Sequence, residues 1–226
     1  MKAYLTELQT EPLEMEREWM VEDIPVLTAR VSIPQPVSTT SPIARRIQRY
    51  YQLQSRSYLN YCARWLLPQA ETEYRTALAA SAPLPCFHAE LTYRITYNES
   101  RFWSLYTQSR EVTLPGQTLL IRRGDTWDLG AGYPVSLRSF FPSHSQWKRR
   151  LLSTAAEEIE RQEKAGISRY HDSWRKDLRR HFNAQNYYLT PEGLAFFYPM
   201  YAIAPSAEGI PTFLFPYEVS RETPPL

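Results

Sequence analysis

Few side chains in this sequence have the type and spacing that catalysis or metal binding requires. The sequence contains four histidines and two cysteines, and no His-Glu-x-x-His or Cys-x-x-Cys spacing brings them together. His88 and Glu90 fall on the same polar face of an alternating segment, where they could act as an acid–base pair. The same alternation is expected of any half-exposed strand without a catalytic role. The pattern predicts no metal site.

Nucleophile motifs and phosphate-binding loops are also missing from the sequence. Asp172 follows His171 and could orient its imidazole, but no Gly-x-Ser-x-Gly motif supplies a nucleophile. With only seven glycines, the sequence has neither a Gly-x-Gly-x-x-Gly nor a Gly-x-x-x-x-Gly-Lys-Ser/Thr loop. We therefore expect no catalytic residues and no nucleotide or other cofactor, and predict that the chain is not an enzyme.

One basic cluster, residues 169–182, could bind a ligand. Apolar residues recur there at four-residue steps and would form one side of a helix: Tyr170, Trp174, Leu178 and Phe182. The opposite side would be basic, with Arg175, Lys176, Arg179 and Arg180. Such a face could bind an anionic polymer or nucleic acid, of which nucleic acid is the less favoured partner. The alternative is a solvated helix face without a function.

Composition indicates a folded chain with an uneven distribution of charge. The 226 residues are 43% hydrophobic, enough to bury a core in one large domain or two small ones. Residues 1–26 hold seven acidic side chains and two basic ones, a net charge of −5. Because the whole chain has a net charge of +2, the remaining residues carry +7. The acidic segment could be a partner-binding arm or a solvated face.

The sequence also bears on compartment and on the state of the cysteines. No run of about 18 apolar residues is present to span a bilayer, and the first residues lack the apolar core of a signal peptide. These features predict a cytoplasmic chain without a transmembrane segment. Cys62 and Cys86 are expected to be free and buried. The alternative disulfide would need an oxidising compartment and Cα atoms within about 7 Å.

The N-terminal part of the chain predicts a hairpin followed by a long helix. Apolar and polar residues alternate over residues 13–21 and 27–33, with residues 22–25 as the connection. The Pro34-Gln35-Pro36 segment would end the second strand, because proline has no donor for the ladder. Ser41 and Pro42 mark the start of a long amphipathic helix. Pro68 would kink or end this helix before a second piece at residues 70–80.

The rest of the chain predicts a meander, two helices and a second hairpin. Strands are expected at 87–98, 101–112 and 118–129, helices at 145–163 and 172–182, hairpin strands at 187–189 and 194–198, and a final strand at 212–216. In the second hairpin Pro191 would set the turn and Gly193 would supply a positive φ. Residues 201–209 would form one helical turn or an irregular crossing.

Together these elements predict an α+β fold. An antiparallel sheet, made of the meander and the C-terminal hairpin, would be packed on one face by the long amphipathic helix and by further helices. Residues 1–26 would be an acidic N-terminal arm or the first strand of a hairpin, and residues 27–226 a single domain.

Two segments carry a resemblance to a known family. They are Trp127-Asp128-Leu129 with Ser136-Leu137-Arg138-Ser139-Phe140-Phe141, and the order of C-terminal hairpin, Ala-Pro-x-Ala-x-Gly crossing and final strand. From Tyr93 to Tyr217 the chain resembles the RsiV-like C-terminal domain, with looser support from Val31 to Pro36. Such a domain occurs in the anti-sigma factor RsiV of Gram-positive bacteria and in the peptidoglycan deacetylase PdaC.

The resemblance implies a function and a location. In RsiV this domain lies outside the cell and recognises lysozyme, and in PdaC it accompanies an enzyme that acts on peptidoglycan. For this chain it implies a non-catalytic binding or sensing domain, outside the cytoplasm, with a lysozyme-like protein or a peptidoglycan component as ligand. An enzyme or polymer-binding module of the cell envelope is the alternative, supported only by the basic cluster.

A partner surface is predicted where aromatic residues exceed what a short strand can bury. Tyr198, Pro199, Met200 and Tyr201 form this surplus, and tyrosine and methionine are favoured at the centres of interfaces. We expect these residues to form a recognition edge together with the loop of Pro115, Gly116 and Gln117. In the alternative interpretation they close the end of the sheet and have a structural role only.

Overall fold

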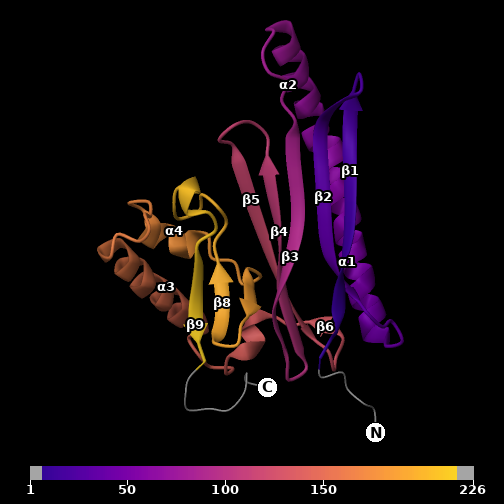
Figure 1. The fold of residues 1–226 in the computed structure, drawn as a ribbon. Helices are drawn as coiled ribbons and strands as arrows, with labels where there is room; N and C mark the ends of the chain where they lie inside the picture. Colours follow the sequence, from indigo (N-terminus) through magenta and orange to yellow (C-terminus); the bar gives the residue numbers. More distant parts are fainter. Residues whose placement is uncertain (1–6, 218–226) are drawn as a thin grey trace. The chain divides into compact units, whose positions relative to one another are not determined.

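The computed structural model describes residues 7–217, and these form two compact units (Figure 1). One unit comprises residues 9–93 and 107–120, and the other comprises residues 7–8, 94–106 and 121–217. The first six residues of the predicted acidic arm lie outside the described part. The predicted division after residue 26 stays a prediction.

The strands form two sheets. A six-stranded sheet has the order β1-β2-β3-β4-β5-β6, and a three-stranded sheet has the order β7-β8-β9. The strands are β1 (Thr10–Val21), β2 (Ile24–Pro36), β3 (Phe87–Glu99), β4 (Phe102–Val112), β5 (Thr118–Asp128), β6 (Tyr133–Pro134), β7 (Tyr187–Leu189), β8 (Gly193–Phe197) and β9 (Thr212–Pro216). The helices are α1 (Pro42–Tyr61), α2 (Leu67–Ala79), α3 (Trp147–Lys164) and α4 (Trp174–Arg180), with a π-helical turn η1 (Cys62–Leu66) and 3-10 turns η2 (Leu137–Phe140) and η3 (Ser206–Glu208).

In the unit of residues 9–93 and 107–120, β1 and β2 form the predicted hairpin. Glu22 and Asp23 connect the strands with φ values of 49° and 62°, as a two-residue type I′ turn requires. The prolines do not end β2, which continues to Pro36. Near the prolines β2 pairs with β1 alone, because its pairing with β3 covers only Leu27–Val31. The backbone N–H that proline lacks would point to the side away from β1, so its absence breaks no hydrogen bond of the sheet.

Helix α1 begins where the sequence predicts. The Ser41 hydroxyl accepts a hydrogen bond from the Ile43 backbone N–H at 3.2 Å, and Pro42 occupies the first turn. The helix does not end near Pro68, because the π-helical turn η1 precedes this proline. In that turn the Leu67 N–H donates to the Cys62 carbonyl, five residues back. Helical structure therefore continues into α2, where Pro68 lies in the first turn and needs no donor.

The helices connect β2 to β3, and these two strands are parallel. Leu27 is opposite Phe87 and Val31 is opposite Leu91. The predicted antiparallel sheet did not include a pairing of these two strands, and the observed six-stranded sheet is mixed. The segment between the strands is long enough, and helical enough, to return the chain in the same direction. Apolar side chains of the strands and helices meet in one core: Val26, Leu27, Ala29, Cys62, Leu66, Ala70, Tyr74, Phe87 and Ala89.

In the other unit, the strand residues of β3, β4 and β5 pack against the three-stranded sheet. The Ser104 hydroxyl accepts a hydrogen bond from the Leu189 N–H at 2.8 Å. A Cβ on Gly124 would lie 1.8 Å from the Tyr187 carbonyl oxygen, so the two backbones are in direct contact. The C-terminal hairpin was predicted to extend the sheet of the meander. It instead forms a separate sheet with β9, paired from Phe197↔Thr212 to Gly193↔Pro216.

Helices α3 and α4 complete this second unit. Leu151, Ala155 and Ile159 of α3 and Trp174 and Leu178 of α4 are buried in its core. Helix α4 is shorter than the predicted span of 172–182, although its apolar side is buried as expected. Gly193 has no positive φ. A side chain there would meet the Phe215 carbonyl oxygen at 2.4 Å, and this close contact explains the glycine.

The fold class is α+β, as predicted. It combines a mixed sheet, a separate antiparallel sheet and helices, and the long helix α1 packs against β2. Both cysteines are free, as predicted; Cys62 is buried and Cys86 is half-buried.

Candidate binding surfaces

The residues predicted to form a recognition edge differ in accessibility. Tyr198 is only 1% exposed; its hydroxyl donates to the Leu178 carbonyl oxygen at 3.0 Å, and its ring packs on Phe213. Tyr201 is 54% exposed, and Met200 is half-buried. Tyr201 also has a φ of +68°, in the left-handed region that non-glycine residues seldom adopt. Tyr201 therefore remains the member of this segment best placed to touch a partner.

The predicted loop of Pro115, Gly116 and Gln117 is exposed and lies in the other unit. The Gln117 N–H donates to the Leu114 carbonyl at 2.9 Å and closes the turn, while Gly116 supplies a φ of +81°. Gln117 also borders an open hollow of about 380 Å³ beside α2, with Gln69 and Thr72 on its helical side. Whether this loop acts together with residues 198–201 stays a prediction.

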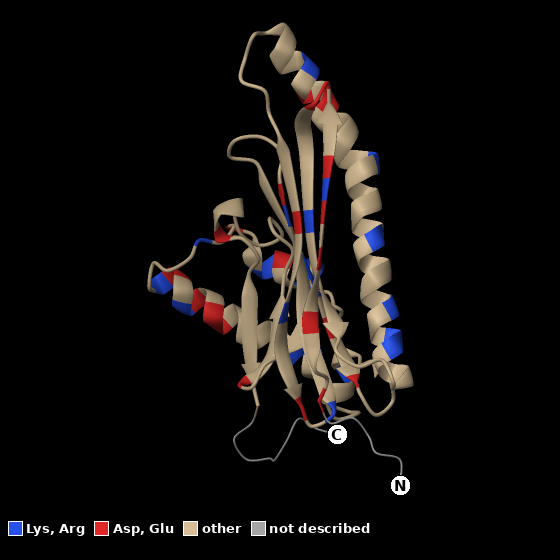
Figure 2. Ribbon diagram, turned by 45° about the vertical axis from the view of Figure 1, so that its right-hand side comes forward, with Lys and Arg blue, Asp and Glu red and all other residues tan. Residues whose placement is uncertain are grey.

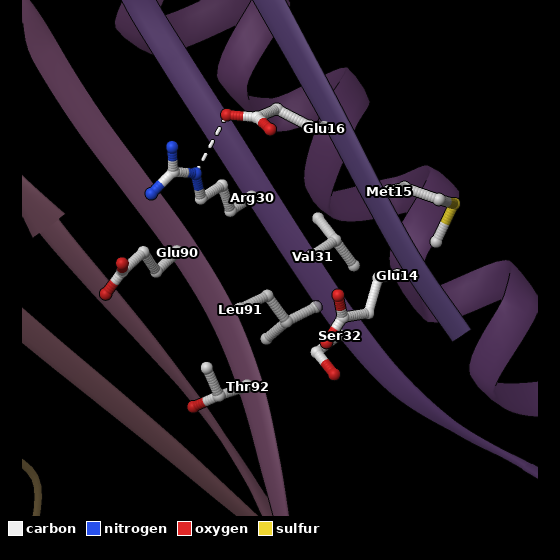
Figure 3. Close-up of a pocket in the computed structure, with 9 residues that line it drawn as sticks. All are labelled: Glu14, Met15, Glu16, Arg30, Val31, Ser32, Glu90, Leu91 and Thr92. Carbon is white, nitrogen blue, oxygen red and sulfur yellow. Dashed lines mark hydrogen bonds and ion pairs between the residues drawn. The ribbon is translucent and has the colours of Figure 1, made fainter. Parts of the chain in front are cut away.

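A larger hollow lies on the polar face of β1, β2 and β3 (Figure 3). It has a volume of about 530 Å³ and is lined by Glu14, Met15, Glu16, Arg30, Val31, Ser32, Glu90, Leu91 and Thr92. The strand register produces this face, because Glu14 is opposite Ser32, Glu16 is opposite Arg30, and Arg30 is opposite Glu90. We call a set of exposed and half-buried side chains on this side of the three strands the acidic face. Its members are Glu14, Glu16, Glu18, Thr28, Arg30, Ser32, His88, Glu90 and Thr92.

A row of alternating charges crosses the centre of the acidic face. The Arg30 Nε lies 2.8 Å from Glu16 Oε1, and an Arg110 guanidinium nitrogen lies 4.0 Å from Glu90 Oε2. The hydrogen bond and the charge of Glu16 raise the pKa of Arg30. These groups are largely exposed, so solvent screens the attraction within each pair. The row places opposite charges on neighbouring strands and has no net charge.

Glutamates on either side of this row give the face its negative charge. Glu14 and Glu18 are exposed, and no ion pair involves either of them among the described residues 7–217. His88, once considered as a base beside Glu90, is exposed on the same face, and Glu90 is engaged with Arg110. Sequence analysis did not identify this site. The alternating glutamates of residues 14–18 were its signal, but only the strand register shows what they lie beside.

The predicted basic cluster lies on α4. Arg175, Lys176, Arg179 and Arg180 are exposed and line one open hollow of about 500 Å³. Arg175 pairs with Glu160 of α3 at 2.8 Å and lies over the Trp174 ring at 4.2 Å. Three cations of the cluster thus remain available to an anionic ligand. This surface is basic over one short helix only.

Burial disfavours the charged forms of a group of titratable side chains around Glu111. Glu111 of β4 is 3% exposed, and burial raises the pKa of its carboxyl group, although a hydrogen bond from the Tyr61 hydroxyl at 3.0 Å opposes this effect. Burial, assisted by the charge of Glu111, raises the pKa of Cys62 to about 12 and that of Tyr61 to about 12. A thiol with a raised pKa is a poor nucleophile at neutral pH. This cluster is suited to packing.

The aspartate of the Trp127-Asp128-Leu129 motif has a structural task. Burial alone would raise its pKa, but hydrogen bonds from Arg101 and from the backbone N–H groups of Ala131 and Gly130 hold the pKa of Asp128 below its ordinary value. The two backbone bonds measure 3.0 Å and 2.8 Å, and Arg101 forms an ion pair with the same carboxylate. Asp128 therefore orders the turn that follows β5.

No three His, Cys, Asp or Glu side chains within residues 7–217 are grouped so that they could hold a metal ion. None of the helices in this part of the chain combines the length and the apolar character that crossing a membrane requires.

The arrangement of strands and helices has known structural counterparts. A member of the DUF3298 family from Bacteroides fragilis superposes with a TM-score of 0.69 at 13% identity, over 95% of this chain and 92% of that chain. A DUF3298 family protein from Pseudomonas aeruginosa gives a TM-score of 0.58 at 17% identity, over 93% and 91%. At these identities the likeness establishes the fold alone.

The sequence points to the same family over part of its length. Residues 138–218 match the family model described as "Protein of unknown function (DUF3298)". The chain matches no curated protein sequence. This C-terminal segment is thus similar to a domain whose function its description leaves open.

Proposed function

We propose that this chain is a non-catalytic binding domain, and that its partner is a protein with a basic surface. The observation that carries the proposal is the acidic face, where unpaired glutamates flank a hollow on an accessible sheet. The resemblance to RsiV-like domains supports a lysozyme-like protein as this partner and an extracytoplasmic location. A peptidoglycan component is the second ligand that the resemblance suggests.

The position of β1 gives the acidic face a means of binding a polypeptide. β1 is a strand of twelve residues at the edge of the sheet, and β2 is its sole neighbour among the described strands. The outer N–H and C=O groups of an edge strand can pair with an added strand, and side chains beside that edge then select the sequence. Charged residues on an edge also prevent unwanted pairing. Selective binding of a basic partner would show that the charged edge binds a partner strand and does not only prevent unwanted pairing.

Calorimetric titration with lysozyme, and in parallel with peptidoglycan fragments, tests the proposal. The double variant Glu14→Lys/Glu18→Lys should weaken lysozyme binding about tenfold or more, because attraction at two positions becomes repulsion. The control Glu157→Lys/Glu163→Lys changes the charge equally on exposed positions of α3 and should bind as the wild type does. Equal affinity of all three proteins would exclude the acidic face, and turnover of a peptidoglycan fragment would contradict the absence of catalysis.

The same titration examines the predicted residues of the Tyr198–Tyr201 segment. Tyr201→Ala should weaken binding without lowering the melting temperature if Tyr201 touches the partner. Tyr198→Ala should instead destabilise the fold by about 3 kcal/mol, as expected for a truncated core aromatic. A loss of stability in Tyr201→Ala would assign that residue a structural role.

The basic cluster supports a second candidate function. A ligand with several negative charges, such as an anionic wall polymer, could occupy the hollow that the four α4 cations line. In that case Lys176→Gln/Arg179→Gln/Arg180→Gln should lose salt-sensitive retention on the polymer. An enzyme of the cell envelope that uses this helix to hold its substrate is the corresponding catalytic alternative.

A further inference from the structure

Helix α1 carries a row of arginines that the proposed function does not use. Arg45, Arg46, Arg49 and Arg56 lie on α1, Arg64 lies on the adjoining turn η1, and all five are exposed. We call them the arginine stripe. From residue 24 to residue 70 the sequence contains no aspartate or glutamate. Figure 2 accordingly shows basic positions along α1 and no acidic ones.

Helical periodicity places the stripe on the side of α1 that faces away from the core. Ala44, Ile47 and Tyr51 are buried on the inner side. With 3.6 residues per turn, Arg45, Arg49 and Arg56 fall within about 40° of one another around the axis. The five-residue turn η1 keeps Arg64 on the exposed side. The stripe is about 28 Å long, from 19 residues at a rise of about 1.5 Å.

Within residues 7–217, no carboxylate neutralises the central part of the stripe. Among the described residues, no ion pair or hydrogen bond involves the guanidinium groups of Arg49, Arg56 or Arg64. A solvated helix face would ordinarily mix both signs of charge, since opposite charges at four-residue spacing stabilise a helix. The absence of acids from the whole 24–70 segment, combined with exposure of all five arginines, favours an anionic partner.

Two large apolar side chains lie exposed among these arginines. Leu53 is 54% exposed between Arg49 and Arg56, and Trp65 is 65% exposed beside Arg64. A single exposed apolar residue needs no explanation. Their location on a charged stripe suits a partner that offers phosphate groups and apolar contacts together, which is the composition of a lipid interface.

We propose that the arginine stripe, with Leu53 and Trp65, is a contact surface for a bilayer of anionic lipids. Arginine binds phosphate through two parallel hydrogen bonds, and tryptophan prefers the depth of the headgroups. A straight row of this length matches a flat surface. If the stripe bound nucleic acid, the apolar Leu53 side chain would face charged phosphates and make no apolar contact. A lipid interface is therefore the better fit.

The proposed surface is separate from the acidic face within the same unit. α1 packs on β2, against the apolar side of the strands to which Leu27 and Val31 belong. Arg30 and Glu90 point to the opposite side of these strands. A unit bound to lipid through the stripe would therefore leave the acidic face open to a basic partner.

Co-sedimentation with vesicles tests the inference. The probes are vesicles of phosphatidylcholine alone and of phosphatidylcholine mixed with phosphatidylserine. Each arginine near an anionic surface is worth about fivefold in partitioning, so Arg49→Gln/Arg56→Gln/Arg64→Gln should lose about 100-fold on the mixed vesicles. The control Lys148→Gln/Arg149→Gln/Lys164→Gln removes the same charge from exposed positions of α3 and should bind as the wild type does. Because all six side chains are exposed, unchanged melting can confirm that both variants fold.

Tryptophan fluorescence and a nucleic acid arm complete the test. Wild-type emission should shift to shorter wavelength on mixed vesicles, and Trp65→Ala should remove the shift. The proposal is overturned if the wild type ignores mixed vesicles at low salt, or if the control variant loses as much binding as the stripe variant. It is also overturned if duplex DNA, and not the vesicles, distinguishes the wild type from the stripe variant. None of these outcomes depends on the lysozyme titration.

Discussion

Glu111 is a carboxyl group placed where ionisation is unfavourable. Its Oε2 accepts the hydrogen bond of Tyr61, whereas its Oε1 is buried without a partner among the described residues. Because burial raises the pKa of Glu111, the folded protein holds this proton more tightly than the unfolded chain does. Its contribution to stability is present below the pKa of the unfolded chain and is lost as pH rises through the folded-state pKa.

Replacement of this acid should therefore stabilise the protein at neutral pH. In Glu111→Gln the side chain keeps its shape and can still accept from Tyr61, but it has no charge to bury. We expect the free energy of unfolding to rise by about 1 kcal/mol near pH 7, with little gain near pH 4. Urea unfolding of both proteins over this pH range measures the difference.

Tyr61→Phe provides the opposite change at the same site. Without the tyrosine hydroxyl neither oxygen of Glu111 has a partner, so stability should fall by about 1–3 kcal/mol. The pKa of Glu111 should also rise further, which makes the loss larger at higher pH. A gain from Glu111→Gln that is the same at every pH would mean that the carboxyl group stays neutral throughout.

At the scale of elements, the contact between β5 and β7 depends on the absence of one side chain. A Cβ on Gly124 would overlap the Tyr187 carbonyl oxygen, and neither backbone can rotate away without breaking its sheet. Gly124→Ala should lower the free energy of unfolding by about 3 kcal/mol or more, as overpacking against fixed backbone does. Chemical unfolding followed by circular dichroism measures this loss.

Gly116 offers a matched control for this substitution. A Cβ there meets nothing within 4 Å, but its φ is +81°. Gly116→Ala should thus lower the free energy of unfolding by only about 1–2 kcal/mol, the cost of a left-handed backbone conformation for alanine. If Gly124→Ala were no more damaging than Gly116→Ala, the two sheets would not be in the close contact described.

Local patterns in the sequence predicted elements well because burial controls them residue by residue. The alternation of residues 87–98 fixed β3, and Ser41 with Pro42 fixed the start of α1. Alternation specifies which side chains face the core, but not the direction or identity of the neighbouring strand. The parallel β2–β3 pair and the separate sheet of β7, β8 and β9 therefore could not be read from it.

The candidate surfaces show the same limit. The basic side of α4 could be predicted, since helical spacing alone separates Arg179 from Leu178. The acidic face could not, because it depends on Arg30 and Glu90 meeting across strands that are far apart in the sequence. The burial of Tyr198 could not be predicted for a related reason: it comes from Phe213 and Leu178 of other elements, whereas Tyr201 lies in an exposed turn.

At the scale of the molecule, neither compact unit is a continuous piece of chain. Strands β3, β4 and β5 each contribute residues to both units, and the chain also changes unit between residues 8 and 9, so it passes between the units four times. The segment that matches the family model, residues 138–218, covers only part of one unit. A family match over a segment is therefore a poor guide to where an independent domain begins.

A fragment limited to that match should not fold. Residues 138–217 lack the Ser104 hydroxyl that accepts from Leu189, the Val135 carbonyl that accepts from Tyr187 at 2.5 Å, and the Phe102 ring that packs 5.5 Å from Phe140. Two buried polar groups would lose their partners at about 1–3 kcal/mol each, and the core would lose its strand side, against a total stability of about 5–15 kcal/mol. The amide signals of this fragment should lack the dispersion of a folded protein. A fragment of residues 94–217 restores all three contacts and should recover more of that dispersion. Cooperative unfolding of the shorter fragment would instead show that β7, β8 and β9 need no support from the strands before them.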